Sequence, residues 1–468
     1  MARILLVPSI NIYRQRIDPY VPYGLLALQA VSSKYKTQVD ILSLPEGFRQ
    51  ADLQSSDDLC EFLFSAIDIA SYDVVGFSTV TNSFYHTLVF SRYVRSKSPD
   101  CKIIYGGPFV TKLSRQVLSE FDCVDAIFVG ESEISFGDFL ARCDNGGISF
   151  GGIPGVHTRQ EHECAGPIID DLDQLPFITE ARDFVHWFNV CQVGSSADRS
   201  IPLETTRGCP LQCSFCSTRQ VWGARVRRKS PTRLLAEMEL LSNRCGQTFF
   251  NLIGDNVGVP RAHFMAFCEQ FREINKGFTW GCSLKLDRLE ANHLKQMWDA
   301  GGRAMFIGVE SGNQKTLDSV RKKTNVRQEL ENIRTAIRLG FKVDTSFIIG
   351  FPWETLDDIK QTYLLHCELL KSGAHRSQVG ILCPIPGTDI VRDAEIKFDL
   401  WSSYIAEDDI PPNDELKAYT NSLPSLFSHL GHYDTPHVSR IEIKAVRDAA
   451  ARINGLYEKR QTAPWNVF

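Results

Sequence analysis

Short apolar runs alternate with helical stretches in two separate parts of the chain, and this alternation is the strongest constraint on its fold. The first series extends from Arg3 to about Arg142 and contains five β–α units. Continuous apolar strands joined by amphipathic helices predict a parallel sheet that is covered by helices on both faces. We therefore predict an α/β protein that begins with a doubly wound, five-stranded parallel sheet in residues 1–144.

The second series begins at Ile201 and contains six strand patterns, each followed by a helical stretch. The six runs are IPLETTRG, TFFNLIGDN, FTWGCSLKL, AMFIGVES, KVDTSFIIGFP and SQVGILCPIPG. Repeated units of this kind predict a partial (β/α)6 barrel of the TIM type over residues 200–392. Gly, Pro and acidic residues dominate residues 145–199, which we interpret as a linker. We interpret residues 393–468 as a small C-terminal cap or tail.

Three cysteines follow the first barrel strand in the order C-x-x-x-C-x-x-C. They are Cys209, Cys213 and Cys216. An iron–sulfur cluster normally takes a thiolate on every iron, so three thiolates leave one iron of a four-iron cluster open. An open coordination position distinguishes a catalytic metal site from a structural one. The motif therefore predicts a 4Fe-4S cluster that binds a substrate or cosubstrate.

The remaining composition is that of a soluble globular protein. The other eleven of the 14 cysteines are scattered singly, mostly in apolar runs, which is not a disulfide framework. No apolar run reaches the roughly 20 residues of a membrane span, and the start, MARILLVPS, is typical of a strand rather than a secretion signal. The net charge of -5 provides no field that would attract nucleic acid. We expect a cytoplasmic protein with neither a membrane nor a nucleic-acid partner.

Two polar features have simpler interpretations. The one basic run, from Arg225 to Lys229, is short enough to be a solvated loop or a local anion contact. Three histidines near the C-terminus, His429, His432 and His437, have no carboxylate or thiolate pattern around them. We interpret them as surface residues rather than as metal ligands.

Glycines and small polar residues follow three strands of the first series. Ligands of open α/β sheets bind at the carboxyl ends of the strands, and glycine lets the backbone approach a ligand closely. A single glycine pair would be explained by a plain turn, but three such loops in order favour a binding site. The candidate residues are Ser78, Thr79, Gly106, Gly107, Gly130 and Glu131.

The cysteine motif, with Phe215 directly before its third cysteine, resembles the radical S-adenosylmethionine (SAM) superfamily over about Ile201 to Asp389. The resemblance implies that SAM binds the open iron through its amino and carboxylate groups. It also implies that an electron from the cluster cleaves SAM to methionine and a 5′-deoxyadenosyl radical. The SAM-binding residues that it implies are Phe215, Asp255, Ser283, Lys285, Glu310 and Ser346.

The resemblance assigns a task to four of these residues. Asp255 stands where the family contacts the SAM amino group, although a helix N-cap is an alternative. Ser283 and Lys285 lie two apart on a strand and share the face that holds the SAM carboxylate, where many relatives carry arginine. Glu310 matches the glutamate that reaches the ribose hydroxyls.

The first series resembles the cobalamin-binding domain that precedes many such barrels. YGLLALQAV, GFSTV, YGGPFVT and VGESE stand in that family's usual order. The resemblance implies that the six loop residues named above contact cobalamin. The D-x-H-x-x-G sequence, by which some cobalamin proteins supply a histidine to cobalt, is absent, because no histidine precedes His86. The alternative that this domain keeps the cobalamin-binding fold but has lost the cofactor therefore stays open.

These features lead to three functional hypotheses. The first is a radical SAM enzyme that uses cobalamin to methylate an unactivated carbon of a small-molecule natural-product intermediate. The second is a radical dehydration, cyclisation or rearrangement, for example of a sugar diol, without cobalamin. The third is a non-enzymatic iron–sulfur sensor, which would not need a SAM pocket. Either enzyme requires an electron donor such as flavodoxin or ferredoxin, and Trp222, Trp353 and Tyr404 are candidate substrate contacts.

Overall fold

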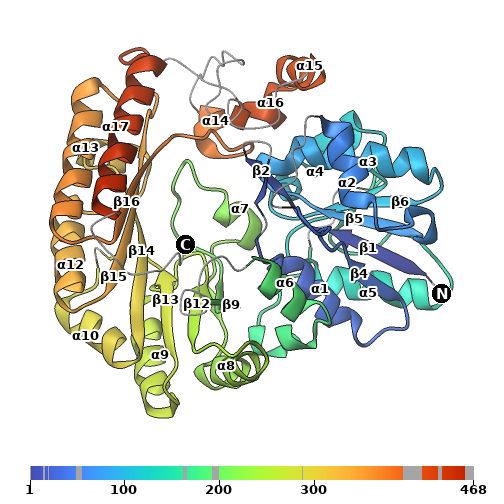
Figure 1. The fold of residues 1–468 in the computed structure, drawn as a ribbon, viewed down its shortest axis with the longest axis horizontal. Helices are drawn as coiled ribbons and strands as arrows, with labels where there is room; N and C mark the ends of the chain where they lie inside the picture. The colour runs from blue at the N-terminus through green and yellow to red at the C-terminus, as the bar shows by residue number, and fades with distance from the viewer. Residues whose placement is uncertain are drawn as a thin grey trace.

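Two α/β units form most of the structure and lie side by side (Figure 1). The computed structural model describes residues 2–13, 16–18, 20–48, 55–161, 166–191, 200–286, 288–393, 414–430 and 435–458. Tyr404 and His432 lie outside these residues. The predicted α/β class is confirmed, and among the described residues no helix is long and apolar enough to cross a membrane.

The sheet of the N-terminal unit has the strand order β4-β1-β5-β6-β7-β8 in the described chain, and its first five strands are parallel. The order reverses between β1 and β5, which is the switch point where doubly wound sheets form a ligand crevice. Its strands are β1 (Arg3–Val7), β4 (Gln38–Ile41), β5 (Val74–Ser78), β6 (Lys102–Gly106), β7 (Ala126–Phe128) and β8 (Val156–His157).

Helices cover both faces of this sheet, as the continuous apolar strands require. Figure 1 places α1 and α5 on one face and α2, α3 and α4 on the other. The helices are α1 (Tyr23–Ser32), α2 (Ser56–Phe64), α3 (Phe84–Lys97), α4 (Val110–Glu120) and α5 (Ser132–Asp144). A hairpin of β2 (Asn11–Tyr13) and β3 (Arg16–Asp18) lies between β1 and α1.

Strand β8 differs from the sequence prediction, because it lies in the segment interpreted as a linker. It pairs antiparallel with β7, so the beginning of that segment completes the N-terminal sheet. Only two residues form the strand, and a glycine-rich segment precedes it, which is why no apolar alternation marked it in the sequence.

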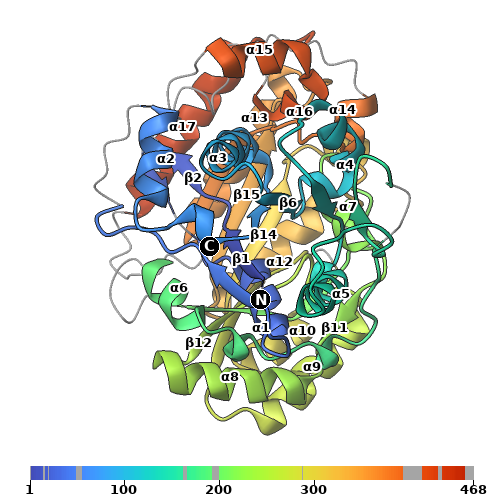
Figure 2. The same cartoon turned by 90° about the vertical axis from the view of Figure 1, so that its right-hand side faces the viewer.

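The second unit is the predicted partial barrel. Its six described strands are all parallel and follow one another in sequence order, β9-β12-β13-β14-β15-β16. They are β9 (Ile201–Glu204), β12 (Phe249–Ile253), β13 (Thr279–Ser283), β14 (Gly302–Glu310), β15 (Lys342–Ile349) and β16 (Arg376–Ile381). Seen from the N-terminal unit, β14 and β15 lie behind that unit's sheet (Figure 2).

Amphipathic helices form the outer layer of the barrel. They are α8 (Pro231–Cys245), α9 (Arg261–Ile274), α10 (Ala291–Asp299), α12 (Val326–Arg338) and α13 (Leu356–Lys371). Shorter elements connect the units and strands: α6 (Phe184–Cys191), α7 (Thr218–Trp222), α11 (Gln314–Ser319), α14 (Asp389–Asp393) and the antiparallel ribbon of β10 (Thr206–Arg207) and β11 (Arg227–Arg228).

The described C-terminal helices contact both units. α17 (Arg440–Glu458) lies beside α13 over the edge strand β16, and the Asn454 side chain accepts a hydrogen bond from the Ser377 amide at 3.0 Å. α15 (Asp414–Ser422) and α16 (Pro424–Phe427) pack on the N-terminal unit, where the rings of Phe427 and Phe84 are 5.6 Å apart. Within the predicted cap, α17 is therefore an outer helix of the barrel, whereas α15 and α16 cover the N-terminal unit.

The interpretation of His429 as a surface residue is wrong. Its side chain is buried next to Phe109 and Phe427, and burial lowers its pKa to about 3. His437 is exposed, as expected. His429 therefore belongs to the packing between the tail and the N-terminal unit.

Candidate functional site

A cavity of about 570 Å³ opens at the carboxyl ends of the barrel strands. The three motif cysteines line it, together with five of the six predicted SAM-binding residues. These are Cys209, Cys213, Cys216, Phe215, Asp255, Ser283, Lys285 and Glu310. Ser346 is not among the lining residues; it lies within β15, where it pairs in register with Gly308.

The cysteine loop is held at both ends by the β10–β11 ribbon. Gly208 begins the loop with a φ of +96°, which favours glycine, and the Cys209 amide donates to the Gly223 carbonyl at 3.2 Å. The middle of the loop is fixed to the barrel, since the Ser214 amide donates to the Val320 carbonyl at 3.0 Å. The loop is thus anchored by backbone contacts that leave its thiols unbonded to each other.

The thiols fit a cluster better than a single metal ion. No group of three or more His, Cys, Asp or Glu side chains in the described ranges is arranged to hold one ion. In a cubane cluster each thiolate binds a different iron, so the thiols surround the cluster instead of meeting at a point. Burial raises the pKa of the Cys213 thiol to about 11, and binding iron would release that proton.

Glu310 has a strained backbone at the end of β14. Its φ is +68°, an unusual value for a residue with a side chain, and strain of this kind gathers at functional sites. Its carboxylate accepts a hydrogen bond from the Lys322 ammonium at 2.8 Å, and Lys322 also donates to the Gly308 carbonyl at 2.6 Å. The surrounding contacts therefore fix the Glu310 side chain in the cavity wall.

Lys322 is a site residue that the sequence analysis missed. It lines the cavity and is buried, and although burial opposes its charge, the Glu310 carboxylate raises its pKa above the ordinary value. A buried lysine needs a charged partner, which the run VRKKTN by itself does not identify. The sequence gives no sign that Lys322, rather than Arg321 or Lys323, is the buried member.

Asp255 joins the second strand of the barrel to the cysteine loop. Its carboxylate accepts a hydrogen bond from the Gly208 amide at 3.0 Å. The alternative role as a helix N-cap is wrong, because α9 begins at Arg261 with Pro260 before it. Burial raises the pKa of Asp255 to about 6, although the Gly208 bond opposes this shift.

The raised pKa predicts a pH effect on SAM binding. If the Asp255 carboxylate holds the SAM ammonium, the affinity for SAM should fall by up to about tenfold per pH unit below pH 6, because protonation removes the charge.

The contribution of Asp255 to the stability of the fold should change with pH in the opposite direction. A carboxyl with a raised folded pKa favours the folded state below its unfolded value of 3.8 and loses that contribution as the pH rises through about 6. SAM titrations from about pH 5 to 8 test the effect on affinity, and Asp255→Asn should remove the dependence.

Ser283 and Lys285 both line the cavity, as predicted, but only Ser283 lies on a strand: β13 ends there, and Lys285 follows it in the loop. The Lys285 ammonium donates to the backbone carbonyl of Lys323, in the same segment as Lys322. Lysine at this position is therefore held from the opposite wall of the cavity. A ligand carboxylate would share this ammonium with the Lys323 carbonyl.

A second cavity, of about 280 Å³, lies at the carboxyl ends of β1, β5, β6 and β7. It is lined by five of the six predicted cobalamin contacts: Ser78, Gly106, Gly107, Gly130 and Glu131. Thr79 is not in the lining, because its hydroxyl is turned to the Gly106 carbonyl at 2.7 Å. Gly107 has a φ of +104°, and a Cβ there would lie 2.6 Å from the Thr79 carbonyl oxygen.

The lining of the second cavity fits a broad, mostly apolar ligand. Glycine backbones form one side, while Tyr20, Tyr23 and Trp222, which the loop prediction did not include, add aromatic surface. No histidine is among its described lining residues, consistent with the missing D-x-H-x-x-G sequence. A corrin ring would find close backbone contacts here, without a histidine for cobalt.

Helix α7 separates the two cavities. Thr218, Arg219 and Gln220 line the first cavity, whereas Val221 and Trp222 line the second. Figure 1 places this helix between the barrel and the N-terminal unit. The segment that follows the last motif cysteine is therefore a shared wall of both sites. Trp222, a candidate substrate contact, lines the second cavity, while Trp353 lines neither.

The interpretation of the basic run as a solvated loop is wrong for two of its residues, although Arg225 is exposed. Arg227 and Lys229 are buried, and Lys229 forms an ion pair with Glu237 at 2.9 Å. Arg227 pairs with Glu131 of the N-terminal unit. The alternative of a local anion contact therefore holds for these two residues, and the anions are carboxylates of the chain itself.

The comparisons with known proteins agree with this arrangement. The radical SAM superfamily model matches residues 203–366, and the B12 binding domain model matches residues 18–140. The cytidylyl-2-hydroxyethylphosphonate methyltransferase of Streptomyces wedmorensis is 24% identical, over 99% of this chain and 92% of its own length. The anaerobic magnesium-protoporphyrin IX monomethyl ester cyclase of Rubrivivax gelatinosus is 29% identical, over 62% of this chain and 53% of its own length.

A solved structure extends the similarity to the whole fold. The radical SAM methyltransferase TsrM from Kitasatospora setae, solved with tryptophan and a SAM analog, has a TM-score of 0.65 at 14% sequence identity. The similarity covers 98% of both chains. The order of the two units and the tail is thus shared with that protein.

Proposed function

From the premise that this chain is a radical SAM enzyme with a B12 binding domain, we propose that it methylates an unactivated carbon of a small-molecule natural-product intermediate. The position of α7 carries the proposal. The first three residues of this helix line the cavity with the three cysteines, and its last two line the cavity of the B12 binding domain. A substrate at this boundary would be within reach of both units.

The cofactors would supply the bond-breaking chemistry. When bound, the 4Fe-4S cluster and SAM provide a 5′-deoxyadenosyl radical that removes hydrogen, and cobalamin provides the methyl group. The chain's task is to bind and orient them. Cys209, Cys213 and Cys216 would hold the cluster, while the glycine loops and Trp222 would hold cobalamin.

The residues around the first cavity would orient SAM by charge. Asp255 would accept a hydrogen bond from the ammonium group, and Ser283 and Lys285 would donate to the carboxylate. Glu310 would accept from the ribose hydroxyls, with Lys322 holding its carboxylate in place. Ser346 would contribute only through β15, because it does not line the cavity.

Domain limits and partners form part of the proposal. We assign residues 1–144 to the cobalamin-binding domain, 145–199 to the linker, 200–392 to the radical SAM barrel and 393–468 to the tail, with β8 an extension of the first domain. An electron donor such as flavodoxin or ferredoxin would reduce the cluster, in the cytoplasm.

Methylation and the alternative, a radical reaction without methyl transfer, consume SAM differently. Methyl donation converts SAM to S-adenosylhomocysteine, whereas radical formation yields 5′-deoxyadenosine and methionine. The reconstituted enzyme should therefore form S-adenosylhomocysteine in an amount that follows the bound cobalamin. If cobalamin-loaded enzyme forms 5′-deoxyadenosine without any S-adenosylhomocysteine, methylation is refuted. The similarity to the cyclase would then favour a non-methylating dehydration, cyclisation or rearrangement.

Replacing Glu310 by glutamine should weaken SAM affinity by about 1.5 to 3 kcal/mol, the usual worth of a hydrogen bond to a charged group. The amide keeps an oxygen for Lys322 but presents no charge to the ribose hydroxyls. SAM titration of the cluster-loaded protein measures the change, and the iron content should equal that of the unmodified enzyme. An unchanged affinity would reduce Glu310 to a structural partner of Lys322.

A further inference from the structure

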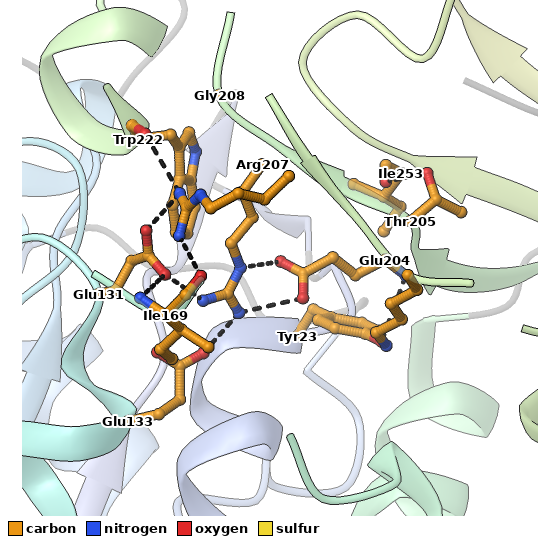
Figure 3. A network of polar contacts seen from close by, with 12 residues as sticks. Tyr23, Glu131, Glu133, Ile169, Glu204, Thr205, Arg207, Gly208, Trp222 and Ile253 are labelled. Carbon is orange, nitrogen blue, oxygen red and sulfur yellow. Dashed lines mark hydrogen bonds and ion pairs between the residues drawn. The ribbon is translucent and has the colours of Figure 1, made fainter. Parts of the chain in front are cut away.

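A carboxylate of the N-terminal unit, that of Glu131, binds the base of the cysteine loop (Figure 3). Arg207 and Arg227 are opposite each other in the β10–β11 ribbon, which closes the loop. Both bind Glu131: Arg207 Nη1 lies 3.0 Å from Oε2, and Arg227 Nη2 pairs with Oε1. One side chain of the N-terminal unit thus connects the strand that enters the loop with the strand that leaves it.

These three side chains are inaccessible to water. The side chains of Arg207, Arg227 and Glu131 are 3%, 2% and 3% exposed. Arg207 also binds both oxygens of Glu204, at 2.8 and 3.0 Å, and Glu133. Because buried charges depend on their partners, Glu131 and the two arginines that it joins constrain one another's positions, whereas Glu133 contacts only one strand of the ribbon, through Arg207.

The remaining contacts of the network reach α7. Arg227 donates to the Trp222 carbonyl at 3.2 Å and to the Ile169 carbonyl at 2.7 Å. The guanidinium of Arg207 lies 4.9 Å from the centre of the Trp222 ring. Trp222 ends α7 and lines the second cavity. The network therefore fixes the end of the shared wall as well as the base of the loop.

We propose that Glu131 is a positioning residue that sets the place of the cysteine loop and α7 relative to the cobalamin cavity. It follows Gly130 directly at the start of α5 and lines the second cavity, and its carboxylate pairs with both arginines of the ribbon. The sequence assigned Glu131 only a cobalamin contact. The contacts to Arg207 and Arg227 give it a second task. This inference depends on the proposed function only in that the proposed function identifies the cofactors.

Hydrogen exchange in the full chain without cofactors tests this role. Glu131→Gln and Glu131→Asp should each speed the exchange of the Cys209 and Ser214 amides about tenfold, because the loop opens more easily. Aspartate keeps the charge but is one methylene too short to reach both arginines. Glu133→Gln is the control. Glu133 binds Arg207 but not Arg227, so this substitution should leave the exchange of the loop amides near its normal rate.

Three results would overturn the proposal. The first is unchanged amide exchange in both Glu131 variants. The second is an equal acceleration of amide exchange in strands β12 to β15. The third is a normal exchange rate of the loop amides in Glu131→Asp, which would mean that charge alone matters. If Glu131→Gln does not fold, Glu131→Asp decides by the same criteria. This test needs no cofactor, so its result stands apart from that of the proposed reaction.

The loaded enzyme gives a second readout. The reduced cluster and cob(II)alamin are both paramagnetic, so pulsed electron paramagnetic resonance of frozen samples reports their separation. Normal enzyme and Glu133→Gln should give the same narrow distribution, and Glu131→Asp a broader or shifted one. An identical distribution in all three would contradict the positioning role.

Discussion

Replacing Cys213 by alanine is expected to abolish both the iron–sulfur cluster and SAM cleavage. Three thiols surround the first cavity, and no other cysteine is among its described lining residues that could take the place of the missing ligand. A cluster held by two thiolates would expose two irons and be lost during desalting. The brown absorbance, the iron content and the yield of 5′-deoxyadenosine with dithionite and SAM measure the effect.

Cys367→Ala is the matched control for this substitution. Cys367 is a half-buried free cysteine on α13, outside both cavities. Its replacement should leave the cluster and SAM cleavage at normal levels. If Cys213→Ala retains SAM cleavage, the assignment of the three-cysteine cluster is wrong.

Replacing Gly208 by alanine should have the second largest effect, although it removes no ligand. Gly208 has a φ of +96°, and an added Cβ would lie 2.1 Å from the Arg225 carbonyl oxygen. Backbone strain of this kind costs about 1–3 kcal/mol, and the clash with backbone in the ribbon adds to it. We expect the loop to move, with cluster content reduced more than about tenfold and a lower melting temperature.

Gly223→Ala separates the clash from the strain. Gly223 ends the same loop with a φ of +75°, but an added Cβ would meet no atom within 4 Å. It should cost about 1 kcal/mol and retain most of the cluster. Equal losses in the two variants would show that the contact with Arg225 is unimportant.

The sequence predicted the fold well where the signal was local. Continuous apolar strands and intervening helices identified both sheets, because burial on two faces leaves no polar alternation. The ends of these strands then indicated where ligand loops would gather. Strand β8 and the packing of α17 on β16 were not predictable in this way, since both depend on pairing with distant segments.

The candidate site shows the same division. The resemblance identified residues that line the first cavity, such as Asp255 and Glu310, because motif spacing fixes their places on the strands. Lys322 and the Glu131 network were missed. Whether an arginine or lysine is buried depends on a carboxylate that the fold brings to it, and Arg207 receives its partner from 76 residues away. No local pattern marks such a pair.

Anaerobic reconstitution of the unmodified protein tests the central claim most directly. The protein is loaded with iron, sulfide and hydroxocobalamin and desalted, its visible spectrum is recorded, and 5′-deoxyadenosine is assayed with dithionite and SAM. We predict that cobalamin stays bound in proportion to the protein and that 5′-deoxyadenosine forms. Formation of 5′-deoxyadenosine without retained cobalamin would contradict the use of both cavities, and its absence would contradict the radical SAM chemistry itself.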